Sequence, residues 1–324
     1  MPNAIVLREY GNSDLLRLQP ITLAHPKKTE ILVRQTAIGV HFHDIYVRTG
    51  LYKTLSLPGV LGLEAAGIVE ALGPGPSIFE VGDRIIYVTS EYGAYASHRI
   101  LQQKLAVKLP GAVSDATAAA NFSRLLTVQM LMTNVTLLKP HHTILVTAAS
   151  GGVGRLLCQH AKAVGARVIG TVGSAEKKEP AKNYGCDYVF TYDQSDLLNS
   201  IKDITNYKGV DIVFDSVGAK TLDRSLSVLA PLGHLVHFGQ SSGHVQSVAI
   251  SRLAEKSLTL TRPILFHYLS DTKTYHLMAK SALEILENRM FLLPDLQCVP
   301  LSEAAFAHDQ MELGQGGGSL YLSP

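Results

Sequence analysis

A glycine-rich turn between a strand and a helix constrains the fold more than any other feature. Residues 143–148 form the apolar, β-branched run of a buried strand, and residues 153–164 have the apolar spacing of a helix. The connecting turn fits the pattern G-x-G-x-x-G, with Ala149, Gly151 and Gly154 in the three small positions. Such a turn lets the main chain approach a pyrophosphate, and the helix start offers it free N–H groups.

The surrounding pattern decides between a nucleotide site and a glycine-rich turn that binds nothing. From residue 143 onward, strands alternate with helical segments such as 153–164 and 175–184. Alternation of this kind predicts an α/β fold with a doubly wound parallel sheet, so we interpret the turn as a dinucleotide site. The expected strands are 143–148, 167–172, 188–191, 210–215, 234–238 and a sixth at 258–261.

The rest of the chain has a different character. A length of 324 residues exceeds what one core usually fills, so we expect two domains. Strand and turn signals dominate the first 110 residues and predict a mainly antiparallel domain, and Ser114 is the expected N-cap of a long helix. The last 60 residues are too few to fold alone and should pack back onto this domain. The expected boundaries are residues 1–124 for the mainly antiparallel domain, 125–264 for the nucleotide domain and 265–324 for the segment completing the first.

The end of the second strand indicates which nicotinamide cofactor binds. An NAD site places a carboxylate there to hold the ribose 2′-OH. Here that strand is followed by Ser174, and the first carboxylate is Glu176. Lys177 supplies a positive charge for a 2′-phosphate and Ser174 a hydroxyl donor, while Tyr192 after the third strand is placed to stack on adenine or reach the phosphate. We therefore predict NADPH, with a solvated lysine as the alternative for Lys177.

Several segments resemble one known family. They are 37–52, 61–67, 148–154, 214–218, 238–243 and 260–263. In these segments the chain is similar to the zinc-free quinone oxidoreductases of the medium-chain dehydrogenase/reductase superfamily, the group that includes zeta-crystallin. The resemblance spans essentially the whole length. It implies a GroES-like domain completed by the C-terminal tail, a Rossmann domain inserted between, and a homodimer.

The resemblance also implies site residues. Expected cofactor contacts are Phe42, Tyr46, Thr127, Ser150, Gly151, Gly152, Val153, Gly173, Ser174, Lys177, Tyr192, Ser216, Val217, Phe238, Gly239, Gln240, Ser241, Ile264, Leu265, Phe266 and Gly317. Expected substrate residues are His41, Tyr52 and Arg124. Two positions depart from the family pattern and alter the expected pocket shape, since His41 replaces the usual Asn and Leu125 the usual Gly.

A zinc site is not expected. Zinc-dependent relatives have a Gly-His-Glu turn where this chain has Gly62, Leu63 and Glu64, so a required imidazole is missing. His41 and His43 are close in sequence, but two histidines without a third ligand do not complete a tetrahedral site.

The expected chemistry is hydride transfer from NADPH to a quinone without metal. The proton that follows the hydride has Tyr46, Tyr52 and Asp44 as candidate donors, with solvent as the alternative. Asp44 has a second interpretation, a hydrogen bond at the start of its helix. Other functions remain open: reduction of α,β-unsaturated carbonyls on the same scaffold, or a non-enzymatic role as a crystallin or RNA-binding protein.

The overall composition limits the kinds of molecule that this protein is expected to bind. The net charge of +2 gives no electrostatic signature of nucleic-acid binding, which we do not expect. Three widely spaced cysteines suit a reducing cytoplasm. We expect neither a signal peptide nor a membrane span, because charges come early and apolar runs stay short of about 18 residues. The expected partner is a small quinone or activated alkene.

Overall fold

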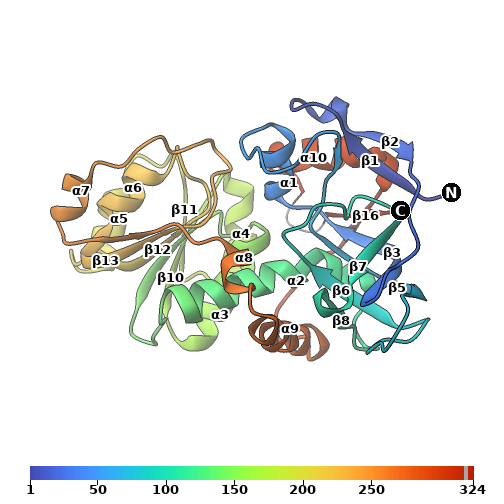
Figure 1. Cartoon of the computed structure of the whole chain (residues 1–324). Helices are drawn as coiled ribbons and strands as arrows, with labels where there is room; N and C mark the ends of the chain where they lie inside the picture. Colours follow the sequence, from blue (N-terminus) through green and yellow to red (C-terminus); the bar gives the residue numbers. More distant parts are fainter. Residues whose placement is uncertain (317–319) are drawn as a thin grey trace. The chain divides into compact units, whose positions relative to one another are not determined.

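The computed structural model describes residues 1–316 and 320–324. It contains two compact units (Figure 1). The first joins Met1–Leu126 with Phe266–Pro324, and the second is Thr127–Leu265. The C-terminal segment thus belongs to the unit formed by the N-terminal residues, as expected for a tail too short to fold alone.

The first unit is built on a seven-stranded sheet. Its order is β15 (Gln297–Pro300), β16 (Leu320–Ser323), β3 (Glu30–Gly39), β5 (Glu64–Leu72), β6 (Arg84–Val88) and β8 (Ala106–Lys108), with β7 (His98–Gln102) also paired to β3. A smaller sheet has the order β2 (Arg17–Pro20), β1 (Asn3–Leu7) and β4 (Gly59–Val60). All of these pairs are antiparallel except β15 with β16. The predicted mainly antiparallel domain is therefore confirmed.

The tail is held by strand pairing and by burial. Tyr321 pairs with Gly39 and Leu322 with Ile38, so β16 continues the sheet beside β3. Val299, Leu301, Ala304, Ala307, Met311, Leu320 and Leu322 join the buried cluster formed by the N-terminal strands. The helices of this unit are α1 (Phe42–Arg48), most of α2 (Asp115–Gln129), α8 (Leu265–Tyr268), α9 (Thr272–Glu287) and α10 (Ala304–Glu312).

The second unit is a doubly wound parallel sheet. Its order is β11 (Tyr188–Thr191), β10 (Arg167–Val172), β9 (Thr143–Thr147), β12 (Val210–Asp215), β13 (Leu229–His237) and β14 (Thr259–Thr261), with every pair parallel. Numbered along the chain, this is the Rossmann order 3-2-1-4-5-6, so the predicted fold class is confirmed. The helices are α3 (Gly152–Val164), α4 (Lys178–Asn183), α5 (Leu197–Ile204), α6 (Leu222–Ser227) and α7 (Ile250–Ala254).

Local sequence explains where the helices begin and end. Ser114 Oγ accepts the N–H of Thr117 at 3.1 Å, so it caps α2 as predicted. Asp271 caps α9 in the same way through Thr274. Helix α3 ends at Gly165, which adopts the left-handed conformation with φ 94°.

Some boundaries differ from the prediction. The helix expected from residue 175 begins as a 3₁₀ turn, Ala175–Lys177, and becomes α-helical only at Lys178. Helix α2 runs on into a π-helix, Met130–Val135, which the sequence pattern did not indicate. Both differences depend on local hydrogen-bond spacing, which apolar periodicity does not encode.

Candidate active site

The nucleotide turn is shaped by close main-chain contact. Ala148 has φ 50°, unusual for a residue with a side chain, and the N–H of Gly151 donates to Ala148 O at 2.8 Å. A Cβ on Gly154 would lie 2.1 Å from the same carbonyl oxygen, closer than any real contact. Only glycine fits there, so α3 can begin directly against β9 and present its first N–H groups beyond the strand end.

Tyr192 lies against this turn. Its hydroxyl accepts the N–H of Ala148 at 2.7 Å, and burial raises the pKa of its phenol well above the ordinary value. A Cβ on Gly173 would be 3.8 Å from the Tyr192 ring. The structure therefore brings together the glycine turn and two residues, Gly173 and Tyr192, that the sequence analysis assigned to the same cofactor.

The buried Asp215 carboxylate organises the turn after β12. It accepts the N–H groups of Val217 and Gly218 at 2.8 and 3.1 Å, and the hydroxyl groups of Thr221 and Ser225 at 2.8 Å. These bonds hold residues 216–218 in a fixed turn. Asp215 was not predicted as a site residue, although a carboxylate ending an apolar strand is a signal for such a role.

The segment after β13 is tied to that turn. Phe238 N–H donates to Asp215 O at 2.8 Å, and Ser241 N–H donates to Ser216 O at 3.2 Å. A Cβ on Gly239 would lie 2.7 Å from Ser216 O, so this close approach needs glycine. The predicted cofactor residues 216–217 and 238–241 are thus adjacent at the carboxyl ends of two neighbouring strands.

An acidic side chain, Glu176, contacts Ser174 at the position expected to bind the 2′-phosphate. Ser174 precedes the 3₁₀ turn Ala175–Lys177, and its hydroxyl hydrogen-bonds the exposed carboxylate of Glu176. That bond is the main reason why the pKa of Glu176 lies below its ordinary value, and Lys177 adds a smaller attraction. A bound phosphate would compete with Glu176 for Ser174.

In the first unit, α1 carries an aromatic cluster. The ring centroids of Tyr46 and Tyr52 are 5.2 Å apart, and those of Phe42 and Tyr46 are 6.2 Å apart. His43 packs against Tyr52 and shares a hydrogen bond of 2.9 Å with the Tyr92 hydroxyl. Tyr46, a predicted cofactor residue, therefore adjoins the predicted substrate residue Tyr52, and Phe42 packs against Tyr46 in turn.

Asp44 is fully buried at the start of α1. Its Oδ2 accepts the backbone N–H of His41 at 2.9 Å and the Tyr95 hydroxyl at 3.2 Å. The helix-start hydrogen bond, the second interpretation of this residue, is therefore present. Burial raises the pKa of the Asp44 carboxyl to about 6, against the opposing attraction of His41.

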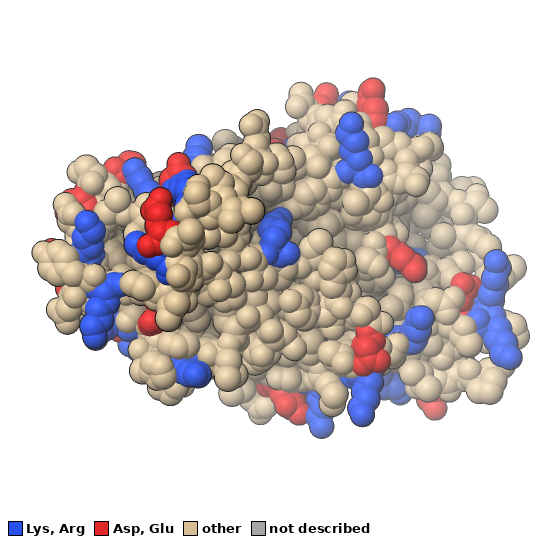
Figure 2. Space-filling view, turned by 60° about the vertical axis from the view of Figure 1, so that its left-hand side comes forward, with Lys and Arg blue, Asp and Glu red and all other residues tan. Residues whose placement is uncertain are grey.

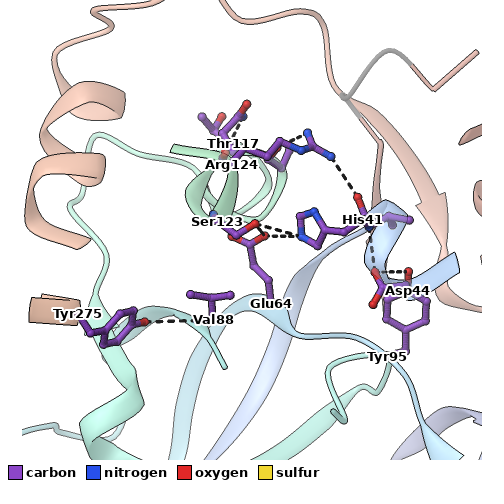
Figure 3. Close-up of polar contacts among 12 residues, drawn as sticks. His41, Asp44, Glu64, Val88, Tyr95, Thr117, Ser123, Arg124 and Tyr275 are labelled. Carbon is purple, nitrogen blue, oxygen red and sulfur yellow. Dashed lines mark hydrogen bonds and ion pairs between the residues drawn. The ribbon is translucent and has the colours of Figure 1, made fainter. Parts of the chain in front are cut away.

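A second buried carboxylate, Glu64, bonds the side chain of His41 (Figure 3). His41 Nε2 lies 2.6 Å from Glu64 Oε2, which also accepts the Ser123 hydroxyl at 2.7 Å. Glu64 Oε1 accepts the Ser123 N–H at 2.7 Å. Neither Glu64 nor Ser123 was predicted as a site residue; the only signal was an acidic residue opening an apolar strand.

Arg124 is also buried. Its guanidinium donates to the carbonyl oxygens of Val40, at 3.1 Å, and of Ala120. Burial lowers the pKa of Arg124 to about 10, with Glu64 acting in the opposite direction. Leu125 beside it is only 1% exposed, so its extra bulk lies in the core.

The predicted residues divide between the two units. His41, Phe42, Asp44, Tyr46, Tyr52, Arg124 and Phe266 belong to the first, and Thr127, the glycine turn, the strand-end residues, Ile264 and Leu265 to the second. Gly317 lies outside the described residues. Among the described residues, no group of three or more His, Cys, Asp or Glu is arranged to hold a metal ion. Nor is any described helix long and apolar enough to cross a membrane.

The second unit fits a dinucleotide on its own geometry. Gly154 and Gly239 fill positions where a Cβ would collide with main chain, and both lie where parallel strands end. With the GroES-like sheet of the first unit, these features define a medium-chain dehydrogenase/reductase. Two family models agree: the alcohol dehydrogenase GroES-like domain matches residues 27–115, and the zinc-binding dehydrogenase domain matches residues 152–282.

Comparison with individual proteins narrows this class. The chain is 40% identical to quinone oxidoreductase 1 of Escherichia coli strain K12 over 328 residues, which cover 100% of both chains. It is 34% identical to a 2-haloacrylate reductase from Burkholderia sp, covering 100% of this chain and 99% of that protein. The crystal structure of Escherichia coli quinone oxidoreductase complexed with NADPH superposes with a TM-score of 0.96 at 39% identity, covering 99% of this chain and 100% of that one. The chain belongs to the quinone oxidoreductase family.

Proposed function

We propose that this protein reduces quinones with NADPH, by hydride transfer and without a metal ion. One observation carries the proposal: α3 begins at a turn so close to Ala148 O that only glycine fits at Gly154, which is the turn that presents helix N–H groups to a pyrophosphate. Full-length similarity to a quinone oxidoreductase solved with NADPH supports the same conclusion. When bound, NADPH supplies the hydride. The protein binds the cofactor and the acceptor, orients them and excludes water.

Each group of predicted residues in the second unit would hold one part of the cofactor. Residues 151–153 offer N–H groups to the pyrophosphate. Ser174 and Lys177 would bind the 2′-phosphate, and Tyr192, which is hydrogen-bonded to the turn, would adjoin the adenine or the phosphate. The turns after β12 and β13, fixed by Asp215, would line the path toward the nicotinamide. The remaining predicted contacts in this unit, Thr127, Ile264 and Leu265, are part of the same proposal.

The residues of the first unit would serve the nicotinamide and the acceptor. Phe42, Tyr46 and Tyr52 offer flat apolar surfaces and two hydroxyl groups, which suit a planar quinone. Tyr46 and Tyr52 remain candidate proton donors. Asp44 acts here as a positioning residue, because its buried carboxyl fixes the N–H of His41.

A second candidate function is reduction of an activated carbon–carbon double bond. It is favoured by the 34% identity to a 2-haloacrylate reductase over the whole chain. Both reactions begin with hydride delivery to an electron-poor acceptor, so the fold does not separate them.

The test is a substrate panel. NADPH oxidation is followed with simple benzoquinones and naphthoquinones, and in parallel with enals, enones and 2-haloacrylates. Larger kcat/KM values for the quinones support the proposal, and larger values for the alkenes favour the second function. If no acceptor is reduced although NADPH binds, both functions are wrong.

Assembly and location are further proposals, the first supported by the family resemblance and the second by the three widely spaced cysteines. We propose a homodimer in the cytoplasm, acting on small molecules. Light scattering coupled to size-exclusion chromatography tests the dimer, and a mass near 35 kDa would contradict it. Basic and acidic side chains are interspersed on the face shown in Figure 2, which agrees with a small-molecule rather than a nucleic-acid partner.

A further inference from the structure

We propose that His41 is the acid that protonates the reduced acceptor, and that Glu64 and Ser123 position it for that step. This inference deepens the proposed quinone reduction and rests on it. It assigns the proton transfer to an imidazole rather than to the tyrosines on α1.

The hydrogen bonds fix which ring nitrogen exchanges the proton. His41 Nε2 lies 2.6 Å from Glu64 Oε2 (Figure 3), so the carboxylate holds the proton on Nε2. Nδ1 is then the nitrogen that gains and loses a proton, as in other carboxylate–imidazole pairs. Ser123 fixes the carboxylate in turn, donating its N–H to Oε1 and its hydroxyl to Oε2, both at 2.7 Å.

Within this pair, only the imidazole can reach a reactant. The Glu64 side chain is 0% exposed, whereas the His41 side chain is 14% exposed. Close packing of the pair depends on Gly39, since a Cβ there would lie 2.8 Å from both Glu64 Oε2 and His41 Nε2. A glycine at this point of β3 leaves room for the ring nitrogen and the carboxylate oxygen to meet at hydrogen-bond distance.

The charged groups around the pair come from three elements. Glu64 at the start of β5 and Asp44 on α1 both favour the imidazolium when ionised. Arg124 on α2 opposes it, but its guanidinium is directed to the Val40 and Ala120 carbonyl oxygens. When both carboxyl groups are ionised, two negative charges against one guanidinium leave a local excess of negative charge around the imidazole.

The proton transfer balances without a further reactant. Hydride addition converts the quinone to a hydroquinone monoanion. The Nδ1–H bond of the His41 imidazolium breaks, its electron pair stays on Nδ1, and an O–H bond forms on the monoanion. Solvent then returns a proton to Nδ1, while the Nε2–H bond to Glu64 stays in place throughout.

The first test measures titration rather than turnover. Histidine side chains are followed by ¹H–¹⁵N NMR against pH in the protein without substrate. Glu64→Gln should move the His41 midpoint down by at least one pH unit, because the amide no longer stabilises the imidazolium. The matched control is Glu70→Gln, which makes the same change beside the surface histidine His98 and should leave the His41 midpoint in place. An unchanged His41 midpoint in Glu64→Gln overturns the proposal.

The second test uses His41→Asn. This variant installs the residue that is usual in the family and leaves the buried Glu64 carboxylate unaltered. We expect kcat with a benzoquinone to fall by about 100-fold, in the range found for lost general acids. The dissociation constant for NADPH, measured by fluorescence, should be unchanged. Added imidazole should restore part of the turnover in His41→Ala. If His41→Asn keeps the wild-type kcat and pH profile, the proposal is wrong although quinone reduction stands. Absence of quinone reduction in the wild type would instead refute the proposed function.

Discussion

The buried Asp44 carboxyl should make the stability of the first unit depend on pH in an unusual direction. Burial raises its pKa from 3.8 to about 6, a shift of about 2 units, and each unit corresponds to about 1.4 kcal/mol. The ionised form of Asp44 should therefore cost the folded unit about 3 kcal/mol at pH 7.

The direction follows from which state binds the proton more tightly. Below pH 3.8 the carboxyl is protonated in both states, and the folded state carries no penalty. Between pH 4 and 6 the unfolded chain ionises while the folded unit keeps its proton, so stability falls as pH rises. Above the folded pKa of about 6 the loss is complete and this contribution becomes constant.

Asp44→Asn removes the ionisation and keeps an oxygen to accept the His41 N–H and the Tyr95 hydroxyl. The free energy of unfolding of this variant minus that of the wild type should rise by about 2 kcal/mol between pH 4 and pH 7. Urea unfolding at several pH values measures the difference, with circular dichroism as the signal. Amide exchange in α1 checks that the transition belongs to the unit carrying Asp44.

A surface carboxyl provides the control. Lys108 lowers the pKa of Asp83 through a hydrogen bond, so Asp83→Asn should lose stability relative to the wild type as pH rises toward 3.8 and should change little from pH 4 to 7. If the Asp44→Asn and wild-type curves run parallel from pH 4 to 7, the assignment of a desolvated carboxyl at Asp44 is wrong.

Three further predictions concern the nucleotide site. Gly154→Ala places a Cβ 2.1 Å from Ala148 O and should weaken NADPH binding at least tenfold in a fluorescence titration, whereas Gly111→Ala, with nothing within 4 Å, should not. Lys177→Glu should raise the KM for NADPH and leave that for NADH unchanged; equal effects on both would contradict a 2′-phosphate contact. Tyr192→Phe leaves the Ala148 N–H without its acceptor and should destabilise the second unit by about 1–3 kcal/mol, measured by urea unfolding; an unchanged midpoint would show that another acceptor replaces the hydroxyl.

How much of this could be foreseen depends on where the information lies in the chain. The glycine turn was predictable because strand, turn and helix are contiguous from residue 143 to 164, and each glycine has a local steric reason. The parallel sheet followed from alternation alone. In contrast, the pairing of β1 with β4, and the parallel pairing of β15 with β16, join segments that carry no mutual signal in sequence.

The same distinction separates the proposed cofactor residues of the second unit from the proposed acceptor residues of the first. The proposed cofactor residues are largely main-chain groups and glycines at strand ends, so they form a motif that can be recognised in the sequence. The residues proposed to serve the acceptor are side chains that meet only after folding: Glu64 hydrogen-bonds Ser123 across 59 residues and His41 across 23. Substitutions there leave the fold and the cofactor turn intact while changing the chemistry presented to the acceptor. His41, which replaces the family's usual asparagine, pairs with a carboxylate buried in the sheet. Acceptor choice and proton delivery should therefore vary among relatives that share this turn, and the His41 variants can test that independence because their NADPH affinity is expected to stay constant.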